Sequence, residues 1–389
     1  LGRKEVLSGK AKFGIFGDGK ELPQIAMAKA FRRGDHRSGY YRDQTFMLAL
    51  NEISVQQIFS ALYANTDLKK EPMSGGRQMG SHFMSNYIDE KGDFIDSTQK
   101  YNSSADISPT SGQMPRLLGL AMASKLYRDG SFNSKNFSNN GNEVAWGTIG
   151  NASTSEGPFF EVFNAAGVHQ VPMIISVWDD EYGISVNNSY QTTKSSISKA
   201  LHGFKRDKSN KGFEIYTVDG WDYQSLIQIY EHSSNFCREN HIPILIHVKN
   251  LTQPIGHSTS GSHERYKNKS RLEWEMKYDC NRKMREWILD NNLSDLSKIE
   301  QIEKDCIEFV KSEKKAAWDD FQKDIIVERD SFIKLIKSLV HQYKSKDLAE
   351  IANSLLRLKD LGRKDVMSAA RRSLSCLLYT SPSPRDRYG

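Results

Sequence analysis

The fold is decided by a turn between a strand and a helix, which reads Gly150-Asn151-Ala152-Ser153-Thr154-Ser155-Glu156-Gly157. An apolar run over 144–149 precedes this turn, and a second run over 171–177 is followed by Trp178-Asp179-Asp180-Glu181-Tyr182-Gly183-Ile184-Ser185. Short apolar runs of this kind indicate buried parallel strands, whose carboxyl ends form the ligand crevice of open α/β sheets. We therefore expect Asn151 and Asp180 to face a common crevice.

The surrounding sequence repeats the same alternation of strands and helices. Further strands are predicted over 213–218 and 242–248, and helices over 114–128, 156–168 and 223–240. Alternating strands and helices imply βαβ units, so we expect an α/β fold with a doubly wound parallel sheet flanked by helices. Long charged amphipathic patterns over 271–291 and 299–333 predict a C-terminal helical extension.

Composition narrows the class of protein. The chain has 389 residues, of which 38% are hydrophobic, and it lacks both a signal-peptide pattern and an apolar stretch of membrane-spanning length. A net charge of +6 is diluted in a 26% charged sequence without the motif of a nucleic-acid reader, so we expect neither a nucleic-acid nor a membrane partner. The four cysteines are scattered without CxxC spacing, which favours a reducing, cytoplasmic location.

The two motifs together carry the chemistry of a diphosphate site. The turn at Gly150, the backbone of Ala152 and Ser153 and the following helix start suit a phosphate group. Oxygen atoms of the Asn151 and Asp180 side chains, with the Tyr182 carbonyl, suit a hard cation such as Mg²⁺. The motifs therefore predict a site for thiamine diphosphate with Mg²⁺. By contrast, Gly17-Asp18-Gly19 is interpreted as a turn and N-cap of a helix over 20–31.

These motifs resemble the alpha part of the thiamine-diphosphate-dependent decarboxylating component of 2-oxo acid dehydrogenases. That family usually shows Gly-Asp/Glu-Gly-Ala-x-Ser-Glu-Gly and later Asn-Asn-Gly-Tyr-Ala-Ile-Ser. Here Asn151 stands where the acid is expected and Asp180 where the amide ligand is expected. The exchange keeps one carboxylate and one amide around the ion. Ala152 and Glu181 replace two family glycines, and Trp178 replaces a residue that is often polar.

Four more segments resemble the family in the expected order. Tyr41-Arg42 resembles its Tyr-Arg-Glu element, which implies that both side chains bind the diphosphate. Residues 76–83 (Gly-Arg-Gln-Met-Gly-Ser-His-Phe) resemble a motif that brings His82 to the active-site mouth. Residues 107–115, which include Ser108 and Thr110, resemble a turn against the aminopyrimidine. Residues 256–260 resemble the Gly-His-Ser loop that carries His257.

The resemblance runs from about residue 13 to 268 and implies an activity. We expect His257 and His82 to be catalytic, because histidines in these loops suit proton transfer or binding of the substrate carboxylate. The implied reaction is decarboxylation of a small 2-oxo acid, branched-chain favoured, followed by acyl transfer to a lipoyl-bearing acyltransferase. An acetoin-cleaving enzyme remains an alternative, whereas the Arg-Gln-Met and Gly-His-Ser segments argue against transketolase. A non-catalytic partner with altered metal ligands is the third reading.

The resemblance also implies a missing half. In this family a glutamate that acts on the cofactor's pyrimidine ring comes from the beta part, and nothing in this chain resembles that part. We therefore expect activity only with a beta part, fused or separate. The expected organisation is 1–268 for the cofactor domain, 269–345 for the helical extension, 346–375 for a linker toward the beta part and 376–389 for a non-native tail. The chain is interpreted as a fragment of a fused bacterial form.

Overall fold

A computed structural model describes residues 1–78, 80, 82–133, 135–259 and 261–380. Two compact units are present, Leu1–Phe309 and Val310–Gly389. The first unit contains all the motifs discussed above. The division falls inside one long helix, within the helical extension expected over 269–345.

The first unit is built on a six-stranded, fully parallel sheet with the order β2-β1-β3-β4-β8-β7. Its strands are β1 (His36–Ser38), β2 (Asn102–Ser103), β3 (Ala145–Gly150), β4 (Met173–Trp178), β7 (Glu214–Asp219) and β8 (Ile244–Lys249). A separate antiparallel hairpin joins β5 (Tyr182–Gly183) to β6 (Val186–Asn187). The register pairs Gly150 with Trp178, so β3 and β4 end at the same level and deliver the two motifs side by side.

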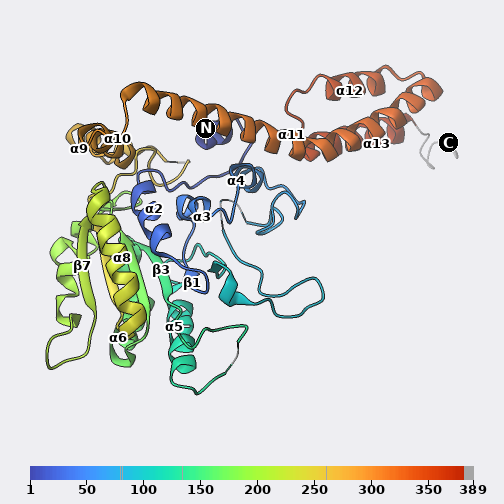
Figure 1. Ribbon diagram of the computed structural model, residues 1–389. Helices are drawn as coiled ribbons and strands as arrows, with labels where there is room; N and C mark the ends of the chain where they lie inside the picture. The colour runs from blue at the N-terminus through green and yellow to red at the C-terminus, as the bar shows by residue number, and fades with distance from the viewer. Residues whose placement is uncertain (79, 81, 134, 260, 381–389) are drawn as a thin grey trace. The chain divides into compact units, whose positions relative to one another are not determined.

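Helices cover both faces of this sheet (Figure 1). The α-helices of the unit are α1 (Gly2–Leu7), α2 (Glu21–Ala30), α3 (Gln44–Ala49), α4 (Val55–Leu62), α5 (Met114–Arg128), α6 (Gly157–His169), α7 (Ile197–Ala200), α8 (Tyr223–Asn240), α9 (Lys269–Lys277) and α10 (Cys280–Asp290). Short 3₁₀ turns η1–η6 are Ser97–Gln99, Ala152–Ser155, Asn188–Tyr190, Thr193–Ser195, His202–Phe204 and His263–Arg265.

Side chains of alternate strand residues point to opposite faces and form two cores. On one face, Trp146, Ile174 and Ile246 pack with apolar residues of α2 and α8. On the other, Ile175 and Leu245 pack with residues of α5 and α6. Both faces are therefore buried, and the predicted doubly wound α/β fold is confirmed.

Individual elements agree with the sequence prediction to different degrees. Helices α5 and α8 have the predicted bounds, and the four long strands begin and end within two residues of the predicted ones. The prediction of a single helix over 271–291 was wrong, because the chain turns before Asp279 and forms two helices there. The Asp279 side chain accepts hydrogen bonds from the backbone N–H groups of Asn281 and Arg282 at 3.1 Å and so caps α10 as a new helix.

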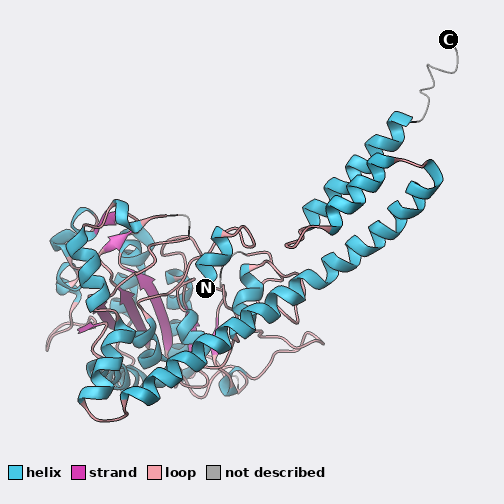
Figure 2. Ribbon diagram, turned by 90° about the horizontal axis from the view of Figure 1, so that it is seen from above, coloured by secondary structure: helices cyan, strands magenta, loops and turns pink. Residues whose placement is uncertain are grey.

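The second unit is helical (Figure 2). It contains most of α11 (Leu296–Tyr343), followed by α12 (Lys346–Leu356) and α13 (Arg363–Thr380). These helices bury a small apolar core that includes Ile336, Leu348 and Leu355. The segment 346–375, interpreted as a linker, thus forms α12 and most of α13. Of the tail 376–389, residues 381–389 lie outside the described residues.

None of the described helices is both long enough and apolar enough to cross a membrane.

Candidate active site

A cavity of about 560 Å³ lies at the carboxyl ends of β3 and β4. The cofactor and metal residues expected from the sequence all line it: Tyr41, Arg42, Ser108, Thr110, Gly150, Asn151, Ala152, Ser153, Asp180, Tyr182 and His257. The lining also contains Lys20, Tyr40, Gln253 and Lys267, which the sequence analysis did not single out. The crevice between the two strand ends is therefore present, and it gathers residues from across the first unit.

His82 is the one expected site residue outside the cavity lining. Its Nε2 lies 2.8 Å from the Ser108 hydroxyl, and its ring centroid is 6.4 Å from that of Tyr41. His82 thus lies next to two residues of the lining. Its motif is only partly described, because Met79 and Ser81 lie outside the described residues; Ser260 of the His257 motif does as well.

Asn151 occupies the turn after β3. Its backbone N–H donates to the Trp178 carbonyl at 3.1 Å, which fixes the turn against the end of β4. The residue is 5% exposed, yet its side-chain Nδ2 has no hydrogen-bond partner among the residues that the structure describes. Buried amides are normally satisfied, and amide N and O positions are interchangeable by a flip. An unpartnered amide facing this cavity therefore fits a ligand or cation that bonds to it.

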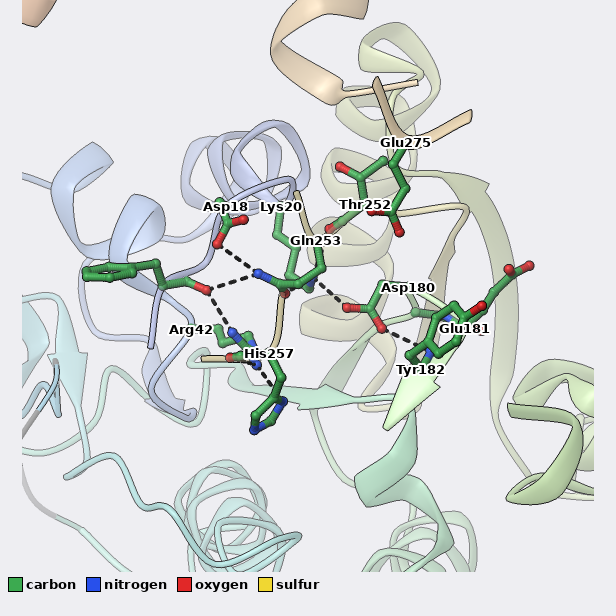
Figure 3. A network of polar contacts seen from close by, with 12 residues as sticks. Asp18, Lys20, Arg42, Asp180, Glu181, Tyr182, Thr252, Gln253, His257 and Glu275 are labelled. Atoms are coloured by element: carbon green, nitrogen blue, oxygen red, sulfur yellow. Dashed lines mark hydrogen bonds and ion pairs between the residues drawn. The ribbon is translucent and has the colours of Figure 1, made fainter. Parts of the chain in front are cut away.

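Asp180 is already engaged on both carboxylate oxygens. Its Oδ2 lies 3.0 Å from the Lys20 ammonium, and its Oδ1 accepts the Tyr182 N–H at 3.2 Å (Figure 3). Burial raises the pKa of this carboxyl group, but the charge and hydrogen bond of Lys20 together with the charges of Arg42 and Lys267 outweigh it and hold the pKa below its usual value. Asp180 is therefore an ionised carboxylate with a resident counter-ion.

Lys20 reaches Asp180 from the amino end of α2. Its ammonium also donates to the Thr252 carbonyl at 3.0 Å and to Gln253 Oε1 at 2.6 Å. The preceding tripeptide does form the expected turn, with Gly19 at a φ of +78°. The expected N-cap was wrong: Lys20 is the cap position and its side chain makes no cap bond, while Asp18 accepts from Gln253 Nε2 at 2.8 Å.

Arg42 fixes the tautomer of the His257 ring. Its Nη2 donates to His257 Nδ1 at 3.0 Å and to the His257 carbonyl at 2.9 Å, while its Nη1 donates to the Phe16 carbonyl at 2.7 Å. A guanidinium can only donate, so Nδ1 must accept and the proton of the neutral ring sits on Nε2. Burial, then the charge of Arg42, lower the pKa of His257 to about 4. His257 is thus a neutral donor.

This arrangement predicts the pH behaviour of His257. Because its pKa falls from 6.5 to about 4 on folding, the unfolded chain binds the proton more tightly; the stability contributed by the neutral ring is present above pH 6.5 and is lost as the pH falls toward 4. An NMR titration of the ring should give a midpoint near 4, and Arg42→Gln should raise it. A midpoint near 6.5 in the unaltered chain would contradict the Arg42–His257 contact.

The loop after β4 is held by Arg271 of α9. Glu181 adopts a φ of +69°, which is strained for a residue with a side chain. Arg271 donates to Glu181 Oε2 and, at 2.9 Å, to the Asp180 carbonyl. Its guanidinium and the Lys267 ammonium also lie 5.5 and 5.3 Å from the centre of the Tyr182 ring. These contacts fix the conformation that presents Asp180 and Tyr182 to the cavity.

The segment Gly14–Phe16 pairs with the loop that carries His257. Gly14 and Thr259 exchange two hydrogen bonds of 3.0 Å, one from the Gly14 N–H to the Thr259 hydroxyl and one from the Thr259 N–H to the Gly14 carbonyl. Gln44 Nε2 donates to the Ile15 carbonyl at 3.0 Å. This segment therefore supports both Arg42 and the His257 loop.

A buried ionic cluster lies beneath the site. Arg37, which is 0% exposed, donates to Asp43 Oδ2 at 2.6 Å and to Asp106 Oδ1 at 2.8 Å. Asp43 also accepts from the Trp178 indole N–H at 3.2 Å and from the Thr148 hydroxyl. Trp178, which replaces a residue that is often polar in the family, thus ties the end of β4 to this cluster.

The fold and the cavity agree with a comparison against known families. The family described as "Dehydrogenase E1 component" matches residues 3–325, and the chain belongs to this family, whose members depend on thiamine diphosphate and are oxidoreductases. Within it, the similarity is to alpha subunits, so the chain is an alpha part of a 2-oxo acid dehydrogenase E1 component.

Three relatives illustrate which alpha subunits the chain is similar to and how much of each one it covers. The 2-oxoisovalerate dehydrogenase subunit alpha of Bacillus subtilis is 27% identical over 273 residues, which are 70% of this chain and 72% of the relative. The pyruvate dehydrogenase E1 component subunit alpha of Rickettsia bellii is 25% identical over 51% of this chain and 55% of the Rickettsia subunit. The mitochondrial pyruvate dehydrogenase E1 component subunit alpha of Dictyostelium discoideum is 23% identical over 73% of this chain and 65% of the Dictyostelium subunit. The chain thus covers little more than half of the Rickettsia subunit.

Proposed function

We propose that this chain is the alpha portion of a 2-oxo acid dehydrogenase decarboxylating component that binds thiamine diphosphate and Mg²⁺ in the cavity at the ends of β3 and β4. The observation that carries the proposal is the unpartnered, buried amide of Asn151 beside Asp180 in that cavity. Among the described residues, His, Cys, Asp and Glu side chains form no group of three that could bind a metal. The proposed ligand set therefore depends on an amide and a backbone carbonyl.

Each lining group has a role in this proposal. Asn151, Asp180 and the Tyr182 carbonyl would bind the cation, and the backbone around Gly150, Ala152 and Ser153 would bind the diphosphate. Thiamine diphosphate, when bound, supplies a nucleophilic carbon and an electron sink for the loss of CO₂.

The remaining groups act on the other parts of the ligands. Tyr41 and Arg42 would bind the diphosphate, and Ser108 and Thr110 would contact the pyrimidine ring; all four residues line the cavity. His257, with its proton on Nε2, can donate to a substrate carboxylate or hold that proton for transfer. His82 would act through Ser108 at the rim.

The branched-chain preference and the partners belong to the same proposal. Similarity to a relative named for 2-oxoisovalerate supports a branched 2-oxo acid as substrate. E1 alpha subunits generally pair with a beta subunit and a lipoyl acyltransferase. We propose that this chain does so too, and that it passes its acyl group to a lipoyl domain.

The requirement for the beta part gives the direct test. The chain alone should release no CO₂ from 3-methyl-2-oxobutanoate in the presence of thiamine diphosphate and Mg²⁺. Addition of a beta subunit from a related E1 component should produce CO₂, faster with the branched acid than with pyruvate. Turnover by the isolated chain would contradict the requirement, and a preference for pyruvate would contradict the substrate.

A second candidate is a partner subunit that no longer binds the cofactor. It is favoured by the Lys20–Asp180 ion pair, which occupies a carboxylate that the metal would use. Calorimetric titration of thiamine diphosphate and Mg²⁺ into the alpha–beta complex separates the two. Binding supports the first candidate, and its complete absence supports the second.

A further inference from the structure

The side chain that meets Asp180 in the cavity comes from α2 rather than from a neighbouring strand. We propose that Lys20 is a resident cation of the metal site: it neutralises Asp180 and makes cofactor binding by this chain less dependent on a divalent ion. The inference rests on the proposed function, since it concerns the same cavity. It adds a residue that sets the metal requirement.

The ammonium of Lys20 is fully satisfied by the protein. It donates to Asp180 Oδ2, the Thr252 carbonyl and Gln253 Oε1 at 3.0, 3.0 and 2.6 Å, and the residue is 2% exposed (Figure 3). An ammonium has three donors, so none is left for a phosphate oxygen while these contacts hold. Lys20 therefore acts on Asp180 and not directly on the cofactor.

The pair changes the charge that a metal ion would meet. Asp180 is ionised, but its charge is balanced by Lys20 at 3.0 Å, and the Asn151 amide carries no charge. Divalent cations prefer anionic oxygen ligands, and a fixed positive charge beside the carboxylate repels an incoming cation. The two side-chain ligands therefore present a set with no net charge to the ion.

The cavity also contains another cation for an anionic ligand. Of the three cationic side chains in the described lining, Lys20 pairs with Asp180, and Lys267 lies 2.7 Å from Glu275. Arg42 bonds instead to neutral groups of Phe16 and His257, so its charge is not offset by those partners. Arg42 and the backbone N–H groups of Ala152 and Ser153 can therefore bind the anionic diphosphate with less help from a metal.

The experiment measures divalent-ion binding directly. Mn²⁺ is titrated into the chain without cofactor and followed by electron paramagnetic resonance, for the unaltered chain and for Lys20→Gln. Glutamine keeps an amide donor for Thr252 and Gln253 but removes the charge. Lys20→Gln should bind Mn²⁺ about tenfold more tightly, because Asp180 regains its net charge. Adding Asp180→Asn to that variant should abolish the gain.

A matched control variant and a second measurement test whether the effect is specific to the charge of Lys20. Lys29→Gln changes an exposed lysine on the same helix and should leave Mn²⁺ affinity unchanged. In the complex with a beta part, the ratio of thiamine diphosphate affinities in Mg²⁺ and in EDTA should rise about tenfold in Lys20→Gln. Lys20→Met provides the same comparison if the glutamine variant does not fold.

The outcomes distinguish the two proposals. Equal Mn²⁺ affinity in the unaltered chain and in Lys20→Gln would overturn the role of Lys20, even if the cofactor binds to both. A tenfold gain in Mn²⁺ affinity without any binding of thiamine diphosphate would support the role of Lys20 and overturn the proposed function.

Discussion

Asp180→Ala is expected to lower the free energy of unfolding by about 3–5 kcal/mol and to abolish Mg²⁺-dependent binding of thiamine diphosphate. The first effect arises because the substitution leaves the Lys20 ammonium buried at 2% exposure without its carboxylate. The second arises because the proposed cation site loses its only carboxylate ligand. Denaturant unfolding measures the first effect, and calorimetry of the complex with a beta part measures the second.

Two further variants complete this test. Asp290→Ala removes an exposed aspartate at the end of α10 and should change neither quantity. The double variant Lys20→Met with Asp180→Leu removes both charges, so it should recover most of the lost stability but none of the Mg²⁺-dependent cofactor binding. Unchanged affinity in Asp180→Ala would show that the cofactor binds elsewhere, and unchanged stability would show that the ion pair does not form.

Arg37→Met is expected to prevent stable folding of the first unit. The guanidinium lies between Asp43 and Asp106, and its loss would leave two carboxylates buried at 0% and 1% exposure without their cation. Breaking one buried ion pair costs about 3–5 kcal/mol, and a whole domain is stable by only about 5–15 kcal/mol. Circular dichroism and denaturant unfolding of the purified chain measure the effect.

The exposed Arg33, three residues before the start of β1, supplies the control. Arg33→Met should unfold at nearly the same denaturant concentration as the unaltered chain. If Arg37→Met unfolds cooperatively within about 1 kcal/mol of the unaltered chain, the cluster with Asp43 and Asp106 contributes far less than its burial indicates.

Periodicity and composition predicted the centre of the fold but not its edge. The runs that became β3, β4, β7 and β8 are long and apolar, and α5 carries a regular apolar face, so local pattern was sufficient. Strands β1 and β2 have three and two residues and were not predicted. Their place depends on pairing with β3 and on the ion pairs of Arg37, which are contacts that no local pattern encodes.

In the site, too, local motifs predicted some residues, whereas others depend on tertiary contacts. Every residue that the motifs assigned to cofactor or metal binding lies in the cavity lining, because those residues follow directly on strand ends or lie in recognisable loops. Lys20 was missed, since its partner Asp180 lies 160 residues further along the chain. Its only signal was a lysine directly after the Gly17–Gly19 turn. Likewise, the bonds from Arg42 to His257 depend on a loop 215 residues away.

The pairing of Gly14 with Thr259 has a consequence for how the protein acquires its site. These hydrogen bonds join positions 245 residues apart, and Arg42 reaches the His257 loop only when both segments are present. Contacts of such high sequence separation form late, after loop-closure entropy has been overcome by the rest of the domain. A ribosome-bound chain that has emerged past β8 but not beyond Thr259 therefore has every strand of the six-stranded sheet but no oriented proton donor.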